Sequence, residues 1–218
     1  MLQIIAMLSM LIDHIGLYIL DDYFPFRLIG RLAAPIYAYF TVCAVFYSKD
    51  FTKHLCKLLI IGMISEIPYL MIHQKLQLNV ILYWAVASYL LNFIVHRHKS
   101  ATRLLLMLLS TLVFYYFPFE GSWYYWFWCC IWLMIEFGKS MEDTGSDCCL
   151  ISLILFSFFL LIFCIRYDMG YCIFSLVSIP IVWILSTKQY SRINNKLFKK
   201  IYSWFYPVHL LLLWYIIK

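Results

Sequence analysis

Long apolar runs alternate with short polar breaks along the whole chain. The runs approach or exceed the roughly 20 apolar residues that a helix needs to cross a bilayer. They lack the alternating pattern of barrel strands, so the pattern favours helices. The predicted spans are 1–20, 26–47, 55–72, 79–95, 104–117, 123–138, 148–165, 171–187 and 201–217. We therefore predict an all-α membrane protein, a polytopic helical bundle of about nine transmembrane helices.

The composition agrees with this pattern. Hydrophobic residues make up 65% of the 218 residues and charged residues only 13%, whereas soluble domains average about 45–50% apolar and about 25% charged. A soluble domain could not bury so much apolar surface, and the length predicts a single domain over residues 1–218. The first span has Asp13-His14 at its centre and no basic start. We therefore expect a retained helix in place of a cleaved signal peptide.

The distribution of lysine and arginine predicts the orientation. One set of alternate loops carries 12 of the 17 basic residues and the opposite set carries 4, with Arg31 inside a span. Cytoplasmic loops are the basic ones, so we expect the N-terminus inside and the C-terminus outside. The basic segment 188–200 has two interpretations that remain open: a helix on the inner membrane surface, or an extended start to the last span.

Several site classes are excluded by missing patterns. The seven glycines form no dinucleotide fingerprint and no phosphate-binding loop. The eight cysteines form no Cys-x-x-Cys, and adjacent pairs such as Cys129-Cys130 make poor tetrahedral metal sites. We predict no metal site and no nucleic-acid partner, and we expect membrane lipids to surround the chain.

Ionisable side chains inside a span are costly and usually functional. Those in the predicted spans are Asp13, His14, Arg31, Glu66, Glu136 and His209, accompanied by the uncharged Ser65 and Asn79. Apart from Glu136, which we expect to reach the inner surface, the charged ones fall between the membrane midplane and its outer third, given a rise of 1.5 Å per helical residue. One pocket could therefore hold them.

The simplest pairing within this group joins Asp13 to Arg31. An unpaired buried charge costs several kcal/mol, so each needs a partner. Arg27 shares a helix face with Arg31, and we expect it at the membrane interface. His209 could be a hydrogen-bonded structural residue, but its depth on the last span matches that of His14 on the first.

Four ordered segments resemble the TraX family of conjugative-pilin acetylases. They are IIAMLSMLIDHIG at 4–16, FRLIGRLAAPIYAYF at 26–40, SEIPY at 65–69 followed by LNV at 78–80, and FYPVHLLL at 205–212. The resemblance implies an integral acyltransferase of the bacterial inner membrane that uses acetyl-CoA. Its acceptor would be the N-terminal amine of a pilin-like protein or another amine. It also implies that a histidine of the first spans is the catalyst, which is His14 in this chain.

The residues suit this chemistry. A neutral imidazole can act as base or nucleophile at about pH 7, and Arg31 or Asn79 could stabilise an oxyanion. The candidate catalytic residues are His14, Asp13, Arg31 and His209, and the candidate substrate-binding residues are Glu66, Asn79 and Tyr206. The phosphates of acetyl-CoA could bind the inner basic residues Arg97, Lys99, Arg103 and 196–200, although the positive-inside rule already accounts for such charge.

Two other functions remain compatible with the sequence. The first is a transporter in which Asp13, His14, Glu66 and His209 relay protons. The second is a non-enzymatic membrane adaptor of a pilus or secretion system, which would tolerate loss of His14.

Overall fold

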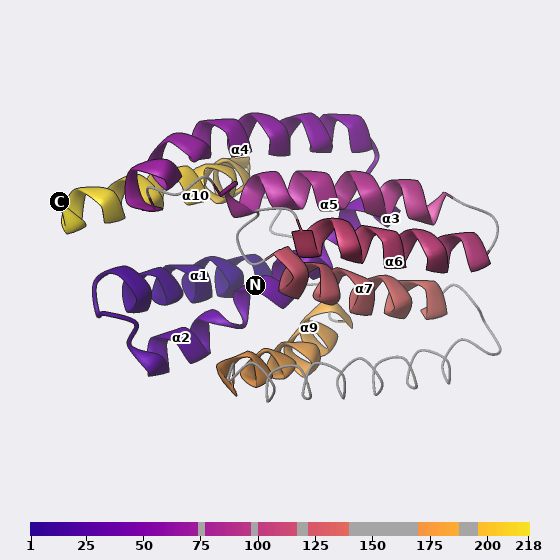
Figure 1. Cartoon of the computed structure of the whole chain (residues 1–218), viewed down its shortest axis with the longest axis horizontal. Helices are drawn as coiled ribbons and strands as arrows, with labels where there is room; N and C mark the ends of the chain where they lie inside the picture. Colours follow the sequence, from indigo (N-terminus) through magenta and orange to yellow (C-terminus); the bar gives the residue numbers. More distant parts are fainter. Residues whose placement is uncertain (74–76, 97–99, 117–121, 140–169, 188–195) are drawn as a thin grey trace. The chain divides into compact units, whose positions relative to one another are not determined.

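The computed structural model describes residues 1–73, 77–96, 100–116, 122–139, 170–187 and 196–218, and its regular elements there are helical (Figure 1). The elements are α1 Leu2–Tyr18, α2 Phe24–Gly30, α3 Ala33–Tyr47, α4 Phe51–His73, α5 Val80–Val95, α6 Ser100–Tyr116, α7 Ser122–Lys139, the 3-10 helix η1 Gly170–Val177, α9 Ser178–Thr187 and α10 Lys196–Ile217. The prediction of an all-α protein is confirmed for the described residues.

Most predicted spans coincide with observed helices within a few residues. The span predicted at 26–47 is instead two helices, α2 and α3, with a break at Arg31 and Leu32. Pro35 explains the break, because a proline removes the hydrogen bond to the carbonyl four residues earlier and clashes with it. The span predicted at 148–165 lies outside the described residues.

Two stretches are long and apolar enough to cross a membrane by length and composition. They are Phe24–Tyr47, which includes α2 and α3, and Phe51–His73, which is α4. Shorter apolar helices include α1 and α5.

The described chain divides into two compact units. Unit 1 contains Met1–Tyr37 and the described part of Ile131–Phe205, and unit 2 contains Ala38–Cys130 and Tyr206–Ile216. Each unit combines segments that are distant in sequence, so neither corresponds to a contiguous sequence domain.

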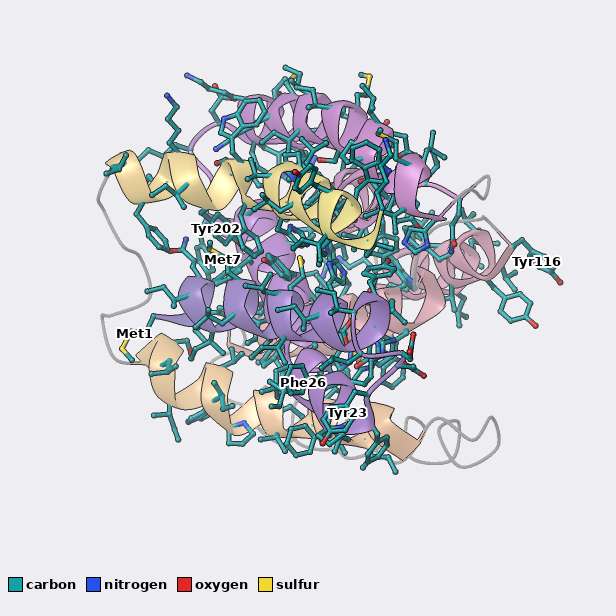
Figure 2. The ribbon with its side chains drawn as sticks, turned by 90° about the vertical axis from the view of Figure 1, so that its left-hand side faces the viewer. Met1, Met7, Tyr23, Phe26, Tyr116 and Tyr202 are labelled. Carbon is teal, nitrogen blue, oxygen red and sulfur yellow. The ribbon has the colours of Figure 1, made fainter. Side chains whose placement is uncertain are left out.

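In unit 1, α1 and α2 form a tight helical hairpin (Figure 1). The Tyr23 amide donates to the Gly16 carbonyl at 2.9 Å, which closes the connecting turn. A Cβ atom on Gly16 would lie 2.6 Å from Cβ of Phe26, so only glycine allows this approach. Figure 2 shows Phe26 beside Tyr23. The centroids of the two rings are 5.5 Å apart.

In unit 2, α4 packs along α5, which also contacts α6 (Figure 1). A Cβ atom on Gly62 of α4 would lie 2.6 Å from Cδ2 of Leu82 in α5, so the small residue brings the two helices together. The buried Tyr83 ring packs against Phe114 at 4.8 Å and Tyr125 at 5.4 Å between centroids. This aromatic core joins α5, α6 and α7.

The final helix, α10, begins at Lys196 and continues through Pro207 to Ile217. Residues 196–200 therefore form the start of the last helix, which agrees with one of the two interpretations of segment 188–200. Residues 188–195 lie outside the described residues.

Candidate functional site

Asp13 forms its direct ion pair with Arg27. Nη1 of Arg27 lies 2.7 Å from Oδ2 of Asp13, and both side chains are largely buried. Arg31, the partner expected from the sequence, attracts the Asp13 carboxylate through its charge. The structure thus corrects the prediction: Arg27 takes the position of direct partner, and Arg31 is a second positive charge acting on Asp13.

The end of α2 explains this correction. The prediction treated 26–47 as one helix, whereas α2 ends at Gly30 and Arg31 is the residue that follows it. Arg27 lies within α2, the helix that packs on α1. Arg27 is therefore mostly buried beside Asp13, although the sequence suggested that it lies at the membrane interface.

The Asp13 side chain packs directly against Gly30. A Cβ atom built on Gly30 would overlap the Asp13 side chain, and Gly30 itself is buried. Its backbone conformation is not the left-handed kind that favours glycine, so the close approach of Asp13 is the reason for a glycine here.

His14 follows Asp13 on α1 and is 6% exposed. Its ring lies 5.6 Å from the Tyr18 ring, one helical turn further along. Successive helical residues point about 100° apart because a turn contains 3.6 residues. His14 and Asp13 therefore face different neighbours, and Asp13 does not by itself orient the imidazole.

Glu66 and Asn79 form a polar link between α4 and α5. The side-chain amide of Asn79 donates to Oε2 of Glu66 and, at 2.8 Å, to the Gly62 carbonyl. Its Oδ1 accepts hydrogen bonds from the amides of Ile81 at 2.9 Å and Leu82 at 3.2 Å. Asn79 is fully buried and is the N-cap of α5.

This geometry gives Asn79 a structural function that the sequence reasoning overlooked. Both of its amide hydrogens are used inside the protein, so an oxyanion would have to displace an existing bond. The missed signal was an asparagine immediately before the apolar run that begins at Val80, which is a typical helix start. The substrate-binding role of Glu66 and Asn79 stays a prediction.

His209 and Tyr206 lie on α10 in unit 2. Both are 3% exposed, and their rings meet edge to face with centroids 5.3 Å apart. His14 and Asp13 belong to unit 1. The pocket predicted to contain both histidines therefore stays a prediction.

The sequence analysis also predicted positions or roles for other charged residues. Glu136, expected to reach the membrane surface, is 4% exposed and thus buried within the protein. Arg97 and Lys99 lie outside the described residues, whereas Arg103 lies in α6 and 196–200 in α10. Among the described residues, no three His, Cys, Asp or Glu side chains gather as a metal site.

The chain is similar to one protein family over almost its full length and to other proteins over shorter stretches. A family model described as TraX protein matches residues 1–217. The chain is 36% identical over 69 residues to a probable fimbrial assembly protein, FimC of serogroup H1, from Dichelobacter nodosus, which covers 30% of this chain and 28% of that protein. It is 34% identical over 83 residues to the uncharacterized protein RP591 of Rickettsia prowazekii (strain Madrid E), covering 38% of this chain and 32% of that protein. The matches thus span about a third of each relative's length. No solved structure matches the chain.

Proposed function

Because this chain belongs to the TraX family, we propose that it is an integral membrane acyltransferase that acetylates an amine acceptor. The acyl donor is acetyl-CoA, and transfer takes place at the outer side of the bacterial inner membrane. The observation that carries the proposal is His14, a buried histidine in an apolar helix of a chain that matches the family along almost its full length.

The proposed reaction forms one bond and breaks another. The amine nitrogen attacks the thioester carbonyl, the new C–N bond forms and the C–S bond breaks. His14 takes the proton released by the amine and returns it to the coenzyme A thiolate. A positioned base of this kind accelerates a reaction by about 10²–10⁴-fold.

Arg31 is the better of the two oxyanion donors suggested by the sequence. Both amide hydrogens of Asn79 are used by Gly62 and Glu66. The positive charge of Arg31 already acts on the region of Asp13, next to His14. We assign the oxyanion role to Arg31, and we keep Tyr206 and His209 as residues that orient the acceptor.

A pilin-like acceptor is supported by one of the relatives. The similar protein from Dichelobacter nodosus is described as a probable fimbrial assembly protein. Fimbriae are built from pilins, and a mature pilin offers an N-terminal amine to an acetyl donor. We therefore propose a pilus-related function for this chain.

The direct test is acetyl transfer by the purified protein. The full chain in detergent is incubated with radiolabelled acetyl-CoA and a series of peptides that carry free N-terminal amines. We expect a labelled amide that is stable to hydroxylamine, together with release of free coenzyme A. Hydrolysis of acetyl-CoA without any labelled acceptor, or no turnover at all, would contradict the proposal.

The same relative also favours a second candidate. A fimbrial assembly protein need not be an enzyme, so this chain could be a non-enzymatic adaptor of a pilus machine. Pilus assembly in cells then separates the two proposals. An adaptor keeps its function when His14 is replaced by alanine, whereas the acyltransferase does not.

A further inference from the structure

Arg27 has an unusual position in unit 1 because it contacts two carboxylates at once. Its Nη1 atom pairs with the largely buried Asp13 at 2.7 Å, and its Nε atom pairs with Asp22 at 2.9 Å. Asp22 is 70% exposed, in the turn that connects α1 and α2. One side chain thus links the interior of the hairpin to its surface.

The turn itself depends on this link. Asp21 and Asp22 have φ angles of 47° and 65°, a left-handed conformation that residues with a Cβ atom adopt at a cost of about 1–2 kcal/mol each. Such strain persists only where the surrounding structure holds it. The Arg27–Asp22 pair and the hydrogen bond between Tyr23 and Gly16 hold this turn.

Asp13 depends on Arg27 even more strongly. Its other carboxylate oxygen, Oδ1, is buried and has no hydrogen-bond partner among the described residues. The carboxylate is therefore anchored through Oδ2 to Arg27 and confined on its other side by Gly30. These contacts fix how α1 is rotated about its own axis against α2.

The rotation of α1 also sets the direction of His14. The two residues are adjacent on one helix, so any rotation that moves Asp13 carries His14 with it. We propose that Arg27 is a positioning residue for acetyl transfer, which holds His14 in its reactive direction by anchoring Asp13 and which couples this geometry to the outer turn through Asp22. The proposal rests on the proposed function.

The test compares variants of the full chain in detergent. Arg27→Gln removes both contacts, and Arg27→Lys keeps the charge but loses the fork that reaches two carboxylates. Asp22→Asn weakens only the exposed contact, and Lys53→Gln is a control that removes one exposed positive charge elsewhere. Both kcat and KM for acetyl-CoA are measured, together with the thermal unfolding midpoint.

We expect kcat of Arg27→Gln to fall by about 10²-fold, the loss typical of a small misplacement of a catalytic group. KM for acetyl-CoA should change little, because Arg27 is not among the residues proposed to bind the donor. Arg27→Lys should recover part of kcat, and Asp22→Asn should lose less than Arg27→Gln. A folded Arg27→Gln or Arg27→Lys variant with parental kcat, or one in which only KM rises, would overturn the proposal.

Unfolding measurements, which need no substrate, test the structural part of the proposal separately from the catalytic part. In double-mutant cycles of unfolding, Asp13→Asn should be strongly non-additive with Arg27→Gln and closer to additive with Arg31→Gln. Equal or stronger coupling to Arg31 would contradict the assigned partner. If the parent transfers no acetyl group, the proposed function has failed. If the parent is active and the Arg27 variants match it, only the present inference has failed.

Discussion

At the scale of single residues, the neighbouring groups separate the functions of Asp13 and His14. Asp13 is paired with Arg27, which occupies its Oδ2 atom. His14 is also buried, but its near neighbour is the Tyr18 ring, and a neutral imidazole tolerates such surroundings better than a carboxylate does. In the proposed mechanism we therefore assign the role of base to His14, with Asp13 as part of its support.

We predict that His14→Ala reduces acetyl-CoA turnover by about 10²–10⁴-fold, the usual loss on removal of a general base. Expression and the unfolding midpoint should stay close to those of the parent. His73→Ala is a matched control, because His73 also packs on a tyrosine ring one turn away, with centroids 4.3 Å apart, and has no proposed catalytic function. Parental turnover by His14→Ala would remove the mechanism proposed here.

The direction of the stability change on replacing Gly30 by alanine tests the contact with Asp13. In an ordinary helix, Gly→Ala stabilises by about 0.5–1 kcal/mol. At position 30 the new methyl group would overlap Asp13, and overpacking of this kind costs about 1–3 kcal/mol. We therefore expect Gly30→Ala to lower the unfolding midpoint and to reduce kcat, because Asp13 must leave its place beside Arg27. A higher midpoint with parental turnover would show that the site relaxes freely.

At the scale of elements, hydropathy predicts the helices well but not their interruptions. The apolar pattern is continuous from residue 26 to 47, so it gives no sign of the break between α2 and α3; that sign is Pro35. Because the prediction ran one helix through residue 31, it gave Arg31 as the partner of Asp13. It therefore missed the contact of Arg27 with Asp13. Long-range pairs such as Glu66 with Asn79 depend on how α4 packs against α5, and no local pattern encodes that packing.

The cap of α5 yields a prediction at this scale. Asp and Ser both cap helices well, but neither supplies the amide hydrogens that Asn79 donates to Glu66 and Gly62. Asn79→Asp also brings a second carboxyl group against Glu66. We expect Asn79→Ser to destabilise by about 1–3 kcal/mol, the cost of an unsatisfied buried group, and Asn79→Asp to destabilise more.

Chemical unfolding in detergent at neutral pH measures both variants. The combination of Asn79→Asp with Glu66→Gln should recover part of the loss, because the glutamine removes the repulsion and supplies a donor. If the Asp and Ser variants are equally stable, the contact with Glu66 contributes little and the N-cap is the main function of Asn79.

At the scale of the whole molecule, the TraX match covers residues 1–217, although the resemblance visible in the sequence was confined to the first 80 residues and the last motif. The apolar composition explains why: the middle of the chain is mostly apolar, and such a run offers few distinctive residues to recognise. The recognisable motifs include side chains with specific partners, such as Asp13 and Asn79. Two apolar stretches of spanning length and the family together point to a membrane protein.

The orientation in the membrane gives the last prediction. Loops that carry 12 of the 17 basic residues should lie in the cytoplasm, which places the N-terminus inside and, with an odd number of spans, the C-terminus outside. A reporter fused after Lys218 should therefore be active in the outer compartment. A second reporter inserted in the basic connection between α3 and α4, at residues 48–50, should be active in the cytoplasm and serves as the control. A cytoplasmic signal at Lys218 would contradict the nine-span topology.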